Sequence, residues 1–67
     1  MAITKKRAQM LRRKFSYVPK GVEVSAQRVS DVKRELEAVY EGRVTNAFAF
    51  RIAVLDQVYP AAPAAGK

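Results

Sequence analysis

The net positive charge of this chain lies entirely in its first twenty residues. They contain seven lysine and arginine residues and no aspartate or glutamate. In residues 21–67 the other six cations are balanced by all six acidic residues, so the net charge of +7 belongs to the N-terminal third. Like charges three or four residues apart repel one another on a helix. We therefore expect the neutral remainder of the chain to supply the core.

The length and the residue types of the chain exclude several classes of protein. Sixty-seven residues make one domain at most, and a domain of about 60 residues buries only about 60% of its unfolded surface. No cysteine or histidine is present, which excludes disulfide scaffolds, the usual zinc sites and imidazole-based catalytic triads. The three glycines stand too far apart for a phosphate-binding glycine loop. We expect a non-enzymatic protein with no metal and no cofactor.

The basic N-terminal segment, residues 1–20, carries a loose helical pattern from Ile3 to about Phe15. Thr4 is suited to cap the start of this helix. No acidic residue lies within pairing distance of its lysines and arginines. We expect this helix to be frayed when isolated and to settle when an anionic surface neutralises it.

A connector with turn chemistry follows at residues 15–25. Pro19 fixes its own φ, and Gly21 is free to adopt a positive φ. The flanking residues alternate and include Phe, Tyr and Val, which is typical of short strands. The pattern predicts either a short β-hairpin or an extended connector.

The clearest helical pattern runs from Ser25 to Gly42. Ser25 is a good N-cap residue, and Gly42 is predicted to end the helix as its left-handed residue. Apolar residues recur between them at helical spacing, at Val29, Val32, Leu36, Val39 and Tyr40.

The segment from Thr45 to Tyr59 fits either a helix or a strand. Its fifteen residues and its alanines favour a helix that Thr45 caps and Pro60 ends. Such a helix is apolar on two sides, so a second element must cover it besides the preceding helix. Either the first helix or another copy of the protein provides that cover. The candidate self-association or partner-binding residues are Phe48, Phe50, Ile52, Leu55 and Tyr59.

These patterns together predict a small, mostly α-helical domain of two or three helices. We expect one domain over residues 1–67, divided into the basic segment 1–20, a helical core at 22–59 and an Ala/Pro-rich tail at 60–67. Apolar stretches are broken by Arg51 and Asp56, so we expect no membrane-spanning segment.

The basic segment favours nucleic acid, DNA or RNA, as the partner. Lysine and arginine neutralise phosphates and release counterions, which dominates sequence-independent binding. Tyr17 stands beside this segment and is the aromatic residue best placed to stack on a base. The other aromatic residues fall on apolar stripes and are assigned to the core. The candidate nucleic-acid-binding residues are Lys5, Lys6, Arg7, Arg12, Arg13, Lys14, Tyr17 and Lys20.

The order of elements from residue 22 to residue 59 resembles that of ribbon-helix-helix repressors. The likeness consists of Val22–Val24 as a strand, the helix to Tyr40, the break at residues 42–46 and a second helix. It implies a DNA-binding dimer in which paired strands enter the major groove and the second helix is buried between subunits. A strand that reads DNA needs polar or basic outward residues, and this one offers Glu23. Element order alone does not assign the chain to that family.

The sequence therefore favours a small accessory or regulatory nucleic-acid-binding protein of phage, plasmid or nucleoid character. A second hypothesis is a structural or interaction subunit of a larger assembly, such as a virion or a ribonucleoprotein particle. A third is an inhibitor that docks its basic segment on an acidic protein surface. We expect the protein in the cytoplasm, or inside a virion or nucleoprotein particle. Binding to a membrane surface is the least favoured alternative, because the apolar side of the basic helix is thin.

Overall fold

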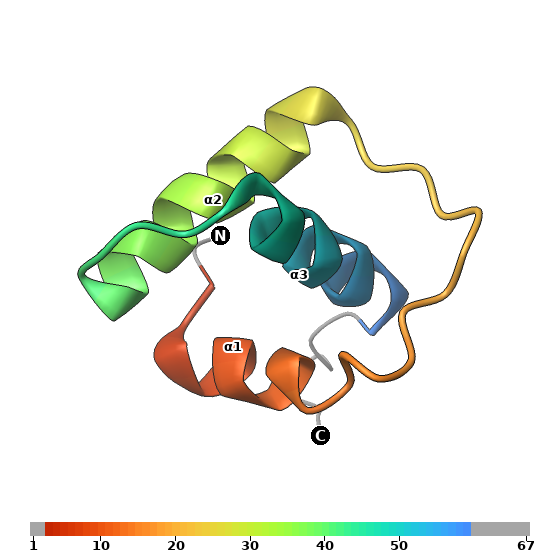
Figure 1. Ribbon diagram of the computed structural model, residues 1–67, viewed down its shortest axis with the longest axis horizontal. Helices are drawn as coiled ribbons and strands as arrows, with labels where there is room; N and C mark the ends of the chain where they lie inside the picture. The colour runs from red at the N-terminus through yellow and green to blue at the C-terminus, as the bar shows by residue number, and fades with distance from the viewer. Residues whose placement is uncertain (1–2, 60–67) are drawn as a thin grey trace, which may run out of the picture.

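Three helices form the part of the chain that the computed structural model describes, residues 3–59 (Figure 1). Helix α1 spans Lys5–Arg12, α2 spans Ala26–Tyr40 and α3 spans Asn46–Val58. No strand occurs within residues 3–59, so the expected small, mostly helical domain is confirmed. The helical alternative for the third element is confirmed as well. The predicted helix stop at Pro60 and the Ala/Pro tail lie outside the described residues.

Each helix begins at a hydroxyl-bearing residue that the sequence predicted as its cap. The three caps are Thr4, Ser25 and Thr45, and the side-chain oxygen of each accepts a 3.1 Å hydrogen bond from the amide three residues later. The first four amides of a helix have no partner inside it. A side-chain cap satisfies one of them and typically stabilises the helix by about 1 kcal/mol.

The predicted stop of α2 at Gly42 is wrong by one residue. Glu41 adopts the left-handed conformation, with φ 52° and ψ 44°. The amides of Glu41 and Gly42 both donate to the carbonyl oxygen of Glu37, the latter at 3.2 Å. The Glu37 carboxylate also accepts a 3.1 Å hydrogen bond from the amide of Val44. Glu37 thus organises the loop that leads into α3.

Residues 13–25 form an extended connector and not a hairpin. A short series of turns leaves α1, and the chain then runs around one side of the molecule to reach α2 (Figure 1). Gly21 takes a φ of 80°, as its place in the predicted turn requires. The side-chain amide of Gln57 donates to the carbonyl oxygen of Glu23 at 3.1 Å and so ties the connector to α3.

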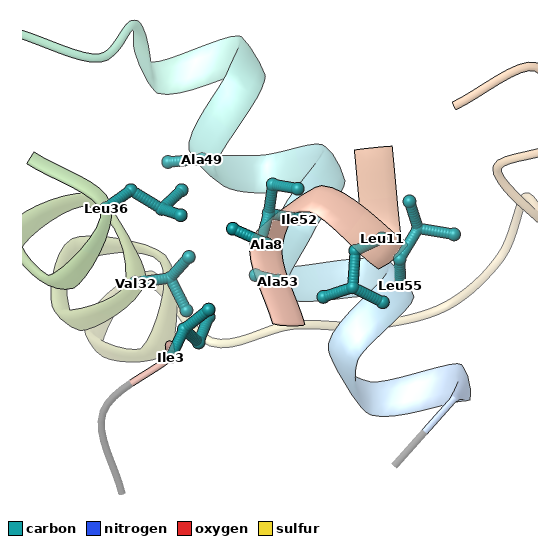
Figure 2. Packing of buried hydrophobic residues seen from close by; sticks show 9 residues of the cluster. All are labelled: Ile3, Ala8, Leu11, Val32, Leu36, Ala49, Ile52, Ala53 and Leu55. Carbon is teal, nitrogen blue, oxygen red and sulfur yellow. The ribbon is translucent and has the colours of Figure 1, made fainter. Parts of the chain in front are cut away.

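The core forms where all three helices meet (Figure 2). Nine buried residues make up this cluster: Ile3, Ala8, Leu11, Val32, Leu36, Ala49, Ile52, Ala53 and Leu55. Helix α3 packs against α2 on one side and against α1 on the other. Helix α1 of the same chain thus covers part of α3, but the second apolar side stays largely uncovered, with Phe50 45% and Val58 37% exposed. The basic segment is part of the folded core and not an appendage to it.

Candidate functional site

Helix α1 presents a basic and polar surface away from the core. We define its outward face as Lys5, Lys6, Gln9, Arg12 and Arg13, all of them exposed. Successive residues of an α-helix are about 100° apart. Lys6, Gln9 and Arg13 therefore point away from the buried Leu11, whereas Lys5 and Arg12 flank this group on the side of the buried Ala8. In Figure 1, α1 lies along one edge of the molecule. Within residues 3–59, no side chain of the outward face forms an ion pair or a hydrogen bond.

Arg7 lies on the same helix but points inward to α3. Its Nε and Nη2 donate to Oδ1 of Asp56 at 3.1 and 2.9 Å. Nη2 also contacts the carbonyl oxygens of Asp56 and Tyr59. Only 13% of the Arg7 side chain is exposed. The structure therefore separates Arg7 from the other predicted nucleic-acid-binding residues.

Asp56 joins all three helices through its two carboxylate oxygens. Oδ1 pairs with Arg7 of α1, and Oδ2 pairs with Arg28 of α2. The Asp56 side chain is 19% exposed, so these charge-assisted hydrogen bonds are partly shielded from water and stronger than surface pairs. This arrangement holds α1 in a defined position on the other two helices.

The remaining predicted site residues follow α1 along the connector. Lys14 places its Nζ 4.5 Å from the centre of the Tyr59 ring, within the range of a cation–π contact. Lys20 is exposed. Tyr17 is 69% exposed, the highest value among the large hydrophobic side chains of the described chain. Tyr17 and Lys20 are therefore accessible, and Lys14 is partly so.

Two arginines from the second half of the chain join the basic surface. Phe15 and Phe48 pack edge to face with centroids 5.3 Å apart. The Arg51 guanidinium carbon lies 5.7 Å from the Phe15 centroid, and that of Arg12 lies 6.0 Å from the Phe48 centroid. The aromatic pair thus brings Arg51 of α3 close to α1.

Arg43 reaches the same region from the loop between α2 and α3. It lines a shallow hollow of about 350 Å³ together with Arg12, Tyr40, Val44, Thr45 and Phe48. Sequence reasoning missed Arg43 and Arg51 because each stands alone among neutral or acidic neighbours. No local pattern marks them, since their approach to α1 depends on how the helices pack.

In the sequence, no acidic residue lies within α1 or before it. Every acid lies between Glu23 and Asp56 in the sequence. Two of them form the ion pairs seen among residues 3–59, Asp56 with Arg7 and Arg28, and Glu37 with Lys33. Folding therefore neutralises one cation of the basic segment, Arg7. The outward face keeps its four positive charges.

The predicted partner-binding residues of α3 separate into buried and exposed members. Ile52 and Leu55 are fully buried in the core, and Phe48 and Tyr59 pack against it. Ile52 and Leu55 are therefore unavailable to a partner, Phe48 and Tyr59 are half-buried, and the remaining member is the most exposed of the five. Phe50 is 45% exposed. It borders a hollow of about 520 Å³ that is also lined by Val24, Ala26, Val29, Ser30, Lys33 and Asn46.

Other kinds of site find little support in this part of the chain. Among residues 3–59 no three acidic side chains gather as they would around a metal ion. None of the helices described is both long enough and apolar enough to cross a membrane. Comparison with protein-family models, with curated proteins and with solved structures gives no match. The resemblance to ribbon-helix-helix repressors fails at its first element, because Val22–Val24 is not a strand.

Proposed function

We propose that this protein is a non-enzymatic nucleic-acid-binding protein of accessory or regulatory type. The observation that carries the proposal is the outward face of α1, whose four cations form no ion pair within residues 3–59. The Glu35 carboxylate, which lies at the start of α1, accepts a 2.9 Å hydrogen bond from the amide of Ile3 and not from these cations. The surface of a folded acidic protein rarely presents evenly spaced negative charges. A phosphate backbone does, and every phosphate neutralised releases condensed counterions.

The packing of α1 supports this function by fixing the cations in place. Leu11 and Ala8 are fully buried, and Arg7 is bonded to Asp56. A positively charged helix held in this way loses less conformational entropy on binding than a free segment does. Lys14 and Lys20 extend the proposed contact beyond the helix, and Tyr17 lies between them in the sequence. The proposal does not need Arg7.

Binding and its salt dependence test this function directly. We would measure fluorescence anisotropy with labelled duplex DNA, single-stranded DNA and duplex RNA, at about 50 and 200 mM salt. If about five phosphates are contacted, log K against log salt has a slope on the order of −5 for duplex DNA. We therefore expect affinity to fall by about two or more decades over this range. No binding to any probe at the lower salt would refute the proposal.

A pair of arginine variants separates a contact from a general charge effect. Arg13→Ala removes one cation from the outward face, and Arg34→Ala removes one exposed cation from α2. Both variants change the net charge equally. We expect Arg13→Ala to weaken binding and to reduce the magnitude of the salt slope by about 1. Arg34→Ala should leave the slope close to that of the unaltered protein.

We propose as a second candidate that the protein is an interaction subunit of a larger assembly. Phe50 favours this candidate, because it is exposed beside an apolar hollow on the outside of α2 and α3. Light scattering on the isolated protein distinguishes the two. A protein that acts alone gives one small defined species, whereas an unpartnered subunit associates without a fixed number of copies.

A further inference from the structure

A neutral amide stands at the centre of the outward face. Gln9 is exposed, and its neighbours three and four residues away on the helix are Lys6 and Lys5 before it and Arg12 and Arg13 after it. Residues at these spacings lie next to one another on a helix surface. All four cations of the outward face therefore surround the side chain of Gln9.

We propose that the partner is duplex DNA, that α1 lies in its major groove, and that Gln9 reads a base there. This inference rests on the proposed nucleic-acid function. The major groove is about 12 Å wide and admits an α-helix, whose diameter with side chains is about 10–12 Å. Helix α1 lies along an edge of the molecule (Figure 1), and the four cations of its outward face are exposed.

The outward face places cations around a central amide, which matches the arrangement of phosphates and base edges in the groove. Phosphates run along both rims of the groove, and base edges lie between them. The cations surrounding Gln9 are long enough to reach the rims, and the shorter amide faces the floor. A glutamine amide can donate to N7 and accept from N6 of adenine, the pairing that best suits this side chain.

Gln9 is available for such a contact. Within residues 3–59 its side chain has no hydrogen-bond partner, and it lines a hollow of about 450 Å³ together with Arg12 and Arg13. A side chain engaged elsewhere in the fold would have to break that bond before binding. The amide of Gln9 keeps its full donor and acceptor capacity for a base edge.

Residues around α1 supply additional cations that could contact the phosphate backbone of DNA. Arg43 and Arg51 lie on the side of Arg12, whereas Lys14 lies over the Tyr59 ring, next to the contact of Arg7 with Tyr59. The ion pair between Arg7 and Asp56 is on the opposite, inward side. A duplex that meets α1 is therefore flanked by cations and meets no carboxylate from the helix itself.

Single-stranded nucleic acid fits these contacts less well. Proteins that bind single strands use successive aromatic side chains as stacking platforms. Tyr17 is highly exposed, but Phe15 and Phe48 pack against each other and against the core. Duplex RNA also fits poorly, because its major groove is too deep and narrow for side chains to read.

The test compares the unaltered full chain with Gln9→Ala on selected duplexes. A duplex DNA library with a randomised central stretch is first selected with the unaltered protein. Anisotropy then measures affinity for the selected duplex, for a version with the preferred A·T pair replaced by G·C, for the same sequence as duplex RNA, and for its single strand. Gln27→Ala is the matched control, since it removes an exposed glutamine from α2.

We expect the unaltered protein and Gln27→Ala to prefer the A·T duplex by about 5- to 150-fold, the range of one good base contact. Gln9→Ala should bind both DNA duplexes alike and retain its salt dependence. Alanine favours helix, and circular dichroism checks that the fold is kept. An unchanged preference in Gln9→Ala would overturn the inference, as would equal or tighter binding of the single strand or the RNA duplex. Those results leave the proposed function standing, whereas no binding to any nucleic acid refutes both.

Discussion

Glu41 is the one residue of the described chain, glycine aside, that has a positive φ. A side chain in the left-handed region brings Cβ close to the following carbonyl oxygen, at a cost of roughly 1–2 kcal/mol. The carboxylate also sits at the negative end of the α2 dipole, where a cation is favoured. Glycine follows immediately at position 42, but its φ lies outside the left-handed range. The helix therefore ends one residue earlier than its glycine suggests.

Replacing Glu41 with glycine is expected to stabilise the protein. Glu41→Gly relieves the strain of the left-handed backbone conformation and removes a negative charge from the C-terminal end of α2. Part of this gain is lost, because glycine raises the conformational entropy of the unfolded chain. We expect the free energy of unfolding in urea to rise by about 0.5–1 kcal/mol. Gly42→Ala is the control, because a Cβ there would lie 3.8 Å from the Tyr40 carbonyl oxygen, an ordinary van der Waals distance. A large loss of stability in Gly42→Ala, with no gain in Glu41→Gly, would show that Gly42 is the left-handed residue.

The loop between α2 and α3 depends on one side chain at the end of α2. The hydrogen bond from the Val44 amide, together with Lys33, holds the pKa of the Glu37 carboxyl below its ordinary value of 4.5. Lys33 Nζ lies 3.2 Å from Oε2 of Glu37. The carboxylate form is thus favoured in the folded protein. Its contribution to stability is complete above the ordinary value and is lost as pH falls through the folded-state pKa.

The pH dependence of unfolding tests this role of Glu37. We expect Glu37→Gln to be less stable than the unaltered protein at neutral pH, because the amide cannot pair with Lys33. The difference should shrink as pH falls below 4.5 and through the lowered pKa of the folded state, where the carboxylate becomes protonated. Urea unfolding at several pH values measures it, with Glu23→Gln in the exposed connector as the control. A difference that stays constant with pH would exclude a role for the Glu37 charge.

At the scale of the molecule, the fold depends on one carboxylate shared by two arginines. Asp56 accepts from Arg7 and Arg28, so it connects α1 and α2 through α3. The same contacts orient α1 so that its outward face points to solvent. Loss of the carboxylate would leave two guanidinium groups close together with no counter-charge. Removing one partner of a buried ion pair costs more than the pair contributes when intact.

Asp56→Asn is therefore expected to weaken the whole domain. The side chains involved are partly exposed, so we expect a loss of about 1–3 kcal/mol, below the range for fully buried pairs. A small domain is stable by only about 0.05–0.15 kcal/mol per residue, so this loss is large. Urea unfolding measures it. Asp31→Asn is the control, since the Asp31 carboxylate accepts from Gln27 of its own helix and forms no ion pair among residues 3–59. Equal stability of the two variants would mean that the arginines stay solvated without Asp56.

The features that follow from local rules could be predicted from the sequence. Thr4, Ser25 and Thr45 cap their helices because a hydroxyl reaches the amide three residues later whatever the rest of the chain does. The apolar spacing of α2 marked its buried side for the same reason, whereas on α3 the apolar residues Phe50 and Val58 are exposed. Charge segregation is also a property of the chain, so the basic character of α1 was evident before its structure.

Contacts between distant residues depended on packing and had no local signal. Nothing near Arg7 in the sequence shows that it is bonded to Asp56, 49 positions away. Arg43 and Arg51 join Arg12 only because α1 lies across α3 with Phe15 against Phe48. The same packing sets Gln9 in the middle of the exposed cations. Helical periodicity predicts which residues share a side of a helix. Which side faces solvent is determined by how the neighbouring helices pack against it.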